Sequence, residues 1–267
     1  RDEERLPFAN QVINDPITFT DAHFDVALQL VKELFRIDLM KIVSRGETTV
    51  LDVDLAAIVR NARRFQQRIG APLLPMIKAD AYGLGAVPVA TALEAVDPWG
   101  YGVATPEEGA RLRAAGIDRP LLIFSSLQLD EVEECLRHRL RPTIGDHRAL
   151  EAWISGSGGP FHVEIDTGMS RAGFRWHDED AISELAARLD GVPGWEGVFT
   201  HFHSADSDDL ACREQLERFE DVLAALPARP PMVHVASSAA AQLDSLRGGD
   251  LARPGIYLYG GRAGTLE

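Results

Sequence analysis

Cysteine is scarce in this sequence, and long hydrophobic runs are missing from it. The 267 residues include two cysteines, Cys135 and Cys212, which lie far apart and outside any CxxC motif. This argues against a disulfide scaffold or a structural zinc site and fits a reducing compartment. No stretch reaches the roughly 20 apolar residues of a membrane span, and the charged opening RDEER does not resemble a secretory signal. We therefore expect a soluble, cytoplasmic protein without a membrane partner.

Basic residues are also outnumbered. Lysine and arginine together number 27 against 41 aspartates and glutamates, which gives a formal net charge of -14. A chain this acidic is poorly suited to bind nucleic acid or an anionic membrane surface, because like charges repel. A small molecule is the better expectation for its ligand.

Short apolar runs alternate with amphipathic helical patterns from about residue 70 onward. Helices are expected over Pro106–Gly116, which has proline near its start and glycine at its end, and over Leu210–Leu226. Strands are expected at Leu73–Ala79, Gly100–Ala104, Leu121–Phe124, Arg141–Ile144, Phe161–Ile165, Gly197–Phe202, Met232–Ala236 and Leu251–Tyr257. Such strand–helix units predict an α/β fold, a (β/α)8 TIM barrel. A doubly wound open sheet is the alternative, since the alternation alone does not show closure.

The first 47 residues do not follow this pattern. We expect residues 1–47 to form an N-terminal appendage, helical because Asp21–Val43 has helical apolar spacing. The segment 48–69 is predicted to be a strand followed by a helix, with Asp54 as the N-cap.

Polar residues follow several of the predicted strands, where a barrel carries its catalytic groups. Each alone is simply explained as a satisfied polar group at a strand end. Their convergence on one rim is harder to explain in that way and predicts an active site. The residues at these strand ends are Lys78, Asp166, Arg171, His201, His203, Ser237, Ser238 and Arg253.

Lys78 is the most unusual of these residues. It follows the apolar run Leu73–Ile77, although lysine is rarely buried. One explanation is that its side chain snorkels to water. The other is that a neutral amine held in partly apolar surroundings attacks a carbonyl to form a Schiff base.

The last two predicted strands are followed by segments that fit an anion site, ASSAAA at 236–241 and RPGIYLYGG at 253–261. Barrels commonly bind phosphate at this place, through backbone N–H groups and hydroxyls. Ser238 would donate a hydroxyl, and Gly255 would let the backbone approach the ligand closely. The alternative is an ordinary turn in which the serines cap a helix.

Two other motifs allow more than one interpretation. His201, His203 and Asp206 could supply metal ligands, but no second ligand cluster accompanies them, so we do not favour a metal site. Arg171 lies between two glycines in EIDTGMSRAGF and would hold a phenolate or carboxylate if it is buried. A surface salt bridge is the alternative for this arginine.

Five ordered segments resemble those that mark alanine racemases: KADAYGLG, EIDTGMSRAGF, THFHSAD, HVASSAA and RPGIYLYG. TTVLDVDLAAIVRN also resembles the usual start of that family. The resemblance covers roughly residues 48–262 and implies the barrel domain that binds pyridoxal 5'-phosphate (PLP). The implied activity is interconversion of L- and D-alanine by removal and return of the α-proton, with serine as an alternative substrate.

The resemblance also implies a role for each residue of the site. Lys78 would hold PLP covalently and act as one of two bases at the α-carbon, while Tyr82 and Ser238 would hold the phosphate with the backbone of the glycine-containing loop. The residues implied for cofactor binding are Lys78, Tyr82, Arg171, His201, Ser237, Ser238, Arg253, Gly255 and Ile256.

Arg253 would face the pyridine nitrogen of the cofactor. A cationic partner keeps that nitrogen unprotonated and weakens the electron sink, which favours simple proton transfer over side reactions. His234 would support Arg253, His201 would lie beside the ring, and Arg171 would hydrogen-bond the phenolic oxygen.

The sequence departs from the family pattern at several positions. Glu164 stands where a lysine is common and would orient Arg171 directly, Ser237 stands where asparagine is common, and Leu84 replaces a usual histidine. The family's second base is a tyrosine from a C-terminal β-domain, supplied by the partner subunit of a homodimer. We expect residues 263–267 to be the start of that region, which is otherwise missing here.

Two other functions remain open from the sequence. A single-domain protein that carries PLP without racemising amino acids is one, although its usual lysine context differs from KADAYG. A metal-dependent barrel hydrolase that uses His201 and His203 is the other.

Overall fold

The computed structural model of the chain describes residues 40–45, 48–156, 159–243 and 249–261. The helices are α2 Leu55–Ile69, α3 Lys78–Gly83, α4 Ala86–Leu93, α5 Pro106–Ala114, α6 Val132–Arg137, α7 His147–Gly156, α8 Glu179–Leu189 and α9 Asp209–Ala225. The strands are β1 Met40–Arg45, β2 Thr48–Val53, β3 Tyr101–Val103, β4 Leu121–Ser126, β5 Arg141–Ile144, β6 Phe161–Asp166, β7 Phe174–Arg175, β8 Trp195–Phe199 and β9 Met232–His234.

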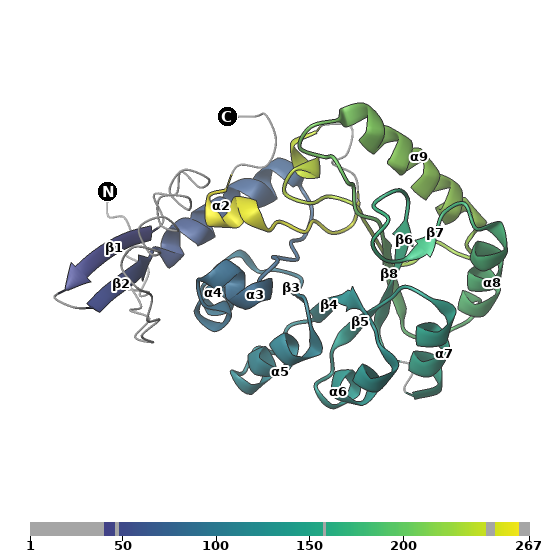
Figure 1. The fold of residues 1–267 in the computed structure, drawn as a ribbon, viewed down its shortest axis with the longest axis horizontal. Coiled ribbons are helices and arrows are strands. Elements are labelled where there is room, and N and C mark those ends of the chain that lie inside the picture. The colour runs from purple at the N-terminus through teal and green to yellow at the C-terminus, as the bar shows by residue number, and fades with distance from the viewer. Residues whose placement is uncertain (1–39, 46–47, 157–158, 244–248, 262–267) are drawn as a thin grey trace.

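Parallel strands form the centre of the molecule, with helices around them (Figure 1). The strand order is β3-β4-β5-β6-β8-β9, and every neighbouring pair is parallel. The short strand β7 pairs with β6 beside this path. Parallel neighbours need crossover connections, and the helices between the strands supply them.

Two more segments close the sheet into a ring. Met76 bridges to Gly102 in β3, and Ser237 bridges to Arg253 beyond β9. Leu73 bridges to Ala252, with Leu74 N–H donating to Ala252 O at 2.8 Å, so the first and last segments meet. The predicted (β/α)8 TIM barrel is therefore confirmed, and the open sheet is wrong.

The first and eighth predicted strands are wrong as continuous strands. Leu73–Ala79 makes single bridges and turns into α3 at Lys78, while Leu251–Tyr257 makes bridges and turns into a 3-10 helix at Ile256–Tyr259. Pro75 and Pro254 interrupt these segments, and proline has no N–H for a ladder. The segments still close the barrel through the donors that remain.

Two of the predicted helices begin at the expected residues, and α9 begins one residue before the predicted Leu210. Asp54 caps α2 by accepting a hydrogen bond from Ala57 N–H, and α5 has Thr105 as its N-cap and Pro106 in its first turn. A capping side chain accepts a hydrogen bond from one of the first backbone N–H groups of the helix, which have no partner within the helix. None of the described helices is long and apolar enough to cross a bilayer.

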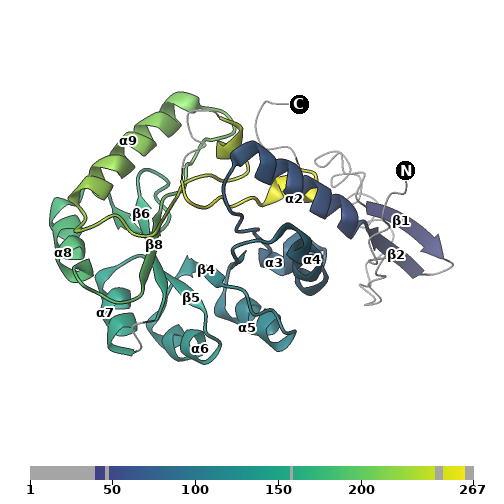
Figure 2. The same cartoon turned by 180° about the vertical axis from the view of Figure 1, so that it is seen from behind.

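A hairpin replaces the C-terminal end of the predicted N-terminal helix. Residues 40–45 form β1, which pairs antiparallel with β2 from Met40–Val53 to Arg45–Thr48. The helical prediction for residues 40–43 is therefore wrong, because pairing with the neighbouring strand overrides helical spacing. The rest of the predicted appendage lies outside the described residues. Figure 2 shows the hairpin standing beyond the end of α2, away from the barrel.

Most of the apolar core lies between the strands and the helices. Trp153, Phe161 and Phe219 are among its fully buried side chains. A smaller cluster of Leu74, Leu122 and Leu251 comes from three members of the ring. Burial of these side chains is the main favourable contribution to folding.

Candidate active site

A cavity of about 630 Å³ opens at the carboxyl ends of the strands. Its wall includes the end of β4 and segments that follow β3, β6, β8 and β9, as well as the first and last members of the ring. This is the end at which barrels place catalytic groups. Nine of its lining residues are those that the sequence singled out for a cofactor: Lys78, Tyr82, Arg171, His201, Ser237, Ser238, Arg253, Gly255 and Ile256.

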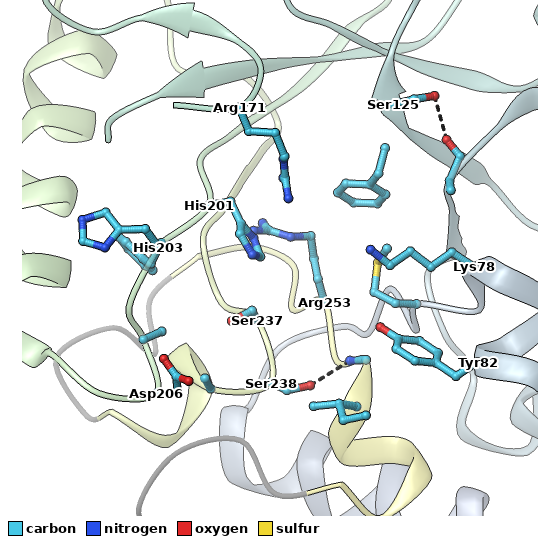
Figure 3. Close-up of a pocket in the computed structure, with 18 residues that line it drawn as sticks. Lys78, Tyr82, Ser125, Arg171, His201, His203, Asp206, Ser237, Ser238 and Arg253 are labelled. Carbon is cyan, nitrogen blue, oxygen red and sulfur yellow. Dashed lines mark hydrogen bonds between the residues drawn. The ribbon is translucent and has the colours of Figure 1, made fainter. Parts of the chain in front are cut away.

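Lys78 is half-buried, and its amine points into the cavity (Figure 3). The four residues that follow it, 79–82, have left-handed backbone angles, with φ between 51° and 58°. None of them is glycine, so this turn stores strain of about 1 to 2 kcal/mol per residue. Strain of this kind persists only where the surroundings hold the backbone in place.

The carboxylate of Glu108 on α5 helps to hold this turn. It accepts hydrogen bonds from Ala79 N–H and Ala104 N–H, both at 2.7 Å. One side chain thus ties the residue after Lys78 to the residue after β3. Sequence reasoning missed Glu108, because its partners lie far apart along the chain and nothing in its local motif indicates them.

Ser238 and the loop at Gly255 form the part of the cavity beside Tyr82. Ser238 Oγ accepts hydrogen bonds from Gly255 N–H at 2.8 Å and from Tyr257 N–H at 3.3 Å. Its own hydroxyl hydrogen is then free to donate to a ligand. A Cβ on Gly255 would lie 2.5 Å from Tyr82 Oη, so the glycine makes room for that hydroxyl.

Arg253 is buried in the floor of the cavity. Its Nη1 donates to His234 Nδ1 at 2.8 Å and to His234 O at 2.7 Å. Its Nη2 donates to Thr200 O at 2.8 Å and to Val235 O at 3.3 Å. All four Nη hydrogens therefore have partners, and among the described residues only the Nε–H lacks one. Burial lowers the pKa of Arg253 to about 10, so it stays charged at neutral pH.

His201 stands beside Arg253 on the cavity wall (Figure 3). Burial, together with the nearby cations Arg253, Arg171 and Lys78, lowers its pKa to about 3. The ring is therefore neutral at physiological pH. The buried amide of Gln215 on α9 fixes this loop by donating to His201 O at 3.2 Å and accepting from His203 N–H at 3.0 Å.

Arg171 reaches into the cavity from the loop after β6 (Figure 3). Its Nη2 lies 3.6 Å from Glu164 Oε1, while Glu164 Oε2 has no hydrogen-bond partner among the described residues. Burial raises the pKa of Glu164 to about 7, an effect that Arg171 and Arg253 partly oppose. The Arg171 side chain is 51% exposed, so the arginine is not buried as the first interpretation required, and its ion-pair partner is Glu164 and neither Asp166 nor Asp178.

His201, His203 and Asp206 do not come together as a set of metal ligands in the structure. The ring of His203 points away from His201 (Figure 3) and contacts the hydroxyl of Ser204 at 2.5 Å. Within the described part of the chain, no group of three or more His, Cys, Asp or Glu residues is placed to hold a metal ion. The geometry therefore gives no support to the metal-dependent hydrolase.

The groups around the cavity define the chemistry that it can accept. Lys78 offers an amine, Ser238 and Tyr82 offer hydroxyls near a loop suited to an anion, and Arg253 offers one N–H from a fixed cation. Together they suit a phosphorylated aldehyde that also carries a hydrogen-bond acceptor.

Comparison with known proteins gives a consistent result. The family model described as "Alanine racemase, N-terminal domain" matches residues 53–263. An alanine racemase of Carboxydothermus hydrogenoformans is 41% identical over 220 residues, which are 78% of this chain and 59% of that relative. An alanine racemase of Geobacillus kaustophilus is 39% identical over 223 residues, 79% of this chain and 57% of the relative.

Solved structures show the same similarity. The crystal structure of alanine racemase from E. faecalis has a TM-score of 0.72 and 34% identity, covering 78% of this chain and 59% of that one. A Bartonella henselae alanine racemase with covalently bound pyridoxal phosphate has a TM-score of 0.71 and 27% identity, covering 78% and 62%. The chain thus spans less than two thirds of the length of these relatives.

Proposed function

The chain belongs to the alanine racemase family, and on that premise we propose that its barrel binds PLP and acts in the racemisation of a small amino acid. The observation that carries the proposal is the convergence of Lys78, Ser238 and Arg253 on one cavity, with Gly255 leaving the space beside Tyr82 open. These residues come from three separate segments of the ring and share no neighbouring position in the sequence.

The residues of the cavity fit PLP. Ser238 and Tyr82 would hold the phosphate with the backbone N–H of Ile256, which stands first in a 3-10 turn and has no partner within that turn. Ser237, on the same wall, accepts from Ala240 N–H at the start of another 3-10 turn, Ala240–Gln242, and would contact the cofactor beside Ser238. Arg171 would donate to the phenolic oxygen.

Lys78 and Arg253 would have different roles in the reaction. When bound, PLP supplies an electron sink that acidifies the α-proton of an attached amino acid. Lys78 would anchor the cofactor and carry the α-proton to and from one face of the substrate. Arg253 would donate its Nε–H to the pyridine nitrogen and so keep that nitrogen unprotonated, while the neutral His201 adds no charge beside it.

The remaining assignments are part of the same proposal. We propose alanine as the substrate, with serine as the alternative, and a barrel over residues 48–262 with 1–47 as an appendage and 263–267 as the start of a further region. We also propose that the protein forms a homodimer and is located in the cytoplasm. The family match over residues 53–263 supports the barrel boundaries, and the two free cysteines, Cys135 and Cys212, fit a reducing compartment.

Exchange of the α-proton into D₂O tests the proposed activity. The PLP-loaded protein is incubated separately with L- and D-alanine, with serine in parallel, and the α-proton signal is followed by NMR. Exchange of both enantiomers, lost in Lys78→Ala, is the expected result. Exchange of one enantiomer would mean that Lys78 acts alone, which contradicts racemisation by this chain. No exchange with PLP still bound would favour the PLP-carrier function.

A further inference from the structure

A series of hydrogen bonds leads from Arg253 through the interior of the barrel. His234, which accepts from Arg253 through Nδ1, places its Nε2 2.8 Å from His162 Nδ1. His162 Nε2 lies 3.3 Å from Glu196 Oε2, which accepts from Arg141 Nε at 2.6 Å. Both histidines are fully buried, whereas the side chain of Glu196 is 20% exposed. The Arg253–Glu196 network, as we call Arg253, His234, His162 and Glu196, thus joins the cavity to the amino ends of the strands.

Only one arrangement of protons satisfies this network. A guanidinium can only donate, so His234 Nδ1 must accept and His234 must carry its proton on Nε2. That proton is donated to His162 Nδ1, which leaves the proton of His162 on Nε2. The carboxylate of Glu196 can only accept, and so it takes this last hydrogen bond. The cation at one end can only donate and the anion at the other end can only accept. Both ends therefore require hydrogen bonds that are donated in the direction from Arg253 to Glu196.

Three other features show that the network is built into the fold. A Cβ on Gly197 would lie 2.5 Å from His162 Nδ1, so β8 carries a glycine where the imidazole ring needs the space. Burial lowers the pKa of both histidines, which keeps each ring neutral and able to donate with one nitrogen while accepting with the other. Arg141 also packs over the ring of Trp99 and holds Glu196 from the outer side.

We propose that Glu196 is a remote positioning residue that, through His162 and His234, fixes Arg253 with its Nε–H toward the cavity. No proton moves along the network; Glu196 reinforces the direction that Arg253 requires, in which each histidine is protonated on Nε2. If His234 carried its proton on Nδ1, two donors would face each other at 2.8 Å and Arg253 would lose a partner. Only the last step, from the Arg253 Nε–H to the cofactor nitrogen, rests on the proposed function.

The protein without cofactor tests the network directly. Long-range ¹⁵N–¹H correlation spectra of histidine-labelled protein report which ring nitrogen carries the proton. We expect His162 and His234 each to be neutral and protonated on Nε2 alone. A proton on Nδ1 of either ring, or a doubly protonated ring, would overturn the proposal. This result does not depend on whether PLP binds.

The variant Glu196→Gln tests the remote residue. Its amide can donate as well as accept, so the reversed direction is opposed at the Arg253 end alone, and we expect a detectable population of reversed tautomers at both histidines and a shifted ¹⁵Nε resonance of Arg253. The matched control is Glu151→Gln, which removes the charge of an exposed glutamate that also pairs with an arginine. Unchanged histidine and Arg253 signals in Glu196→Gln, or equal changes in the control, would refute the role of Glu196.

A second readout connects the network to the cofactor. In protein loaded with PLP that is ¹⁵N-labelled in its ring, Glu196→Gln should shift the ring-nitrogen resonance. If the tautomers change but that resonance does not, the link from Arg253 to the cofactor is wrong. If PLP does not bind at all, the proposed function fails while the tautomer result stands.

Discussion

The choice of amino acid at a single position in this barrel can be explained by the atoms that a side chain there would contact. Gly255 shows this most clearly, because its backbone angles, φ -118° and ψ -99°, do not place it in the left-handed region that favours glycine. A side chain at this position is instead excluded by Tyr82 Oη, which would lie 2.5 Å from a Cβ added to Gly255. The sequence suggested a close approach at Gly255, but the approaching group is a hydroxyl of the protein itself.

A double-mutant cycle tests this explanation. We expect Gly255→Ala to lower the free energy of unfolding by about 1 to 3 kcal/mol through overpacking. In a Tyr82→Phe background the nearest side-chain carbon of residue 82 would be 3.4 Å away, an ordinary contact, so the same change should cost much less. Urea unfolding of the four proteins without cofactor measures both costs. Equal costs in the two backgrounds would show that Tyr82 is not the cause.

At the scale of elements, local signals predicted some features and missed others. The starts of α2 and α5 could be predicted because Asp54 and Thr105–Pro106 act within a few residues of themselves. The left-handed turn after Lys78 could not, because its residues are not glycines and its support comes from Glu108, which is 29 positions from Ala79. Hydrogen bonds such as that between His162 and His234 span 72 positions and leave no local pattern.

The strain in the turn after Lys78 leads to a prediction about its first residue. Ala79 is exposed and has φ 51°, where an L side chain is disfavoured by about 1 to 2 kcal/mol and glycine is not. Glycine costs about 0.5 to 1 kcal/mol in chain entropy, so Ala79→Gly should leave stability unchanged or raise it by up to about 1.5 kcal/mol.

The control for this prediction is Ala187→Gly, at an exposed position in α8. This change relieves no strain, and it should lower the free energy of unfolding by about 0.5 to 1 kcal/mol. Chemical denaturation measures the free energy of unfolding of both variants relative to the unmodified protein. A similar loss of stability in the two variants would mean that the turn after Lys78 is not strained.

At the scale of the whole molecule, the site exists because the ring closes. Lys78 follows the first member of the ring and Arg253 lies in the last, and the two meet only because Leu73 pairs with Ala252. The alternation of strands and helices predicted the barrel, but the closure depends on long-range hydrogen bonds such as that from Leu74 N–H to Ala252 O. The candidate residues could be named from motifs, whereas their common cavity required the folded ring.

Mapping the covalent attachment of PLP tests the central claim, that this ring carries the cofactor on Lys78. The sequence has three lysines, Lys32, Lys41 and Lys78, so the attachment site can be assigned without ambiguity. The protein is incubated with PLP, reduced with borohydride, digested and analysed by mass spectrometry, with Lys78→Ala as the control. We predict a pyridoxyl group on Lys78 and none on the variant. Labelling of Lys32 or Lys41 in place of Lys78, or equal labelling of the variant, would contradict the account.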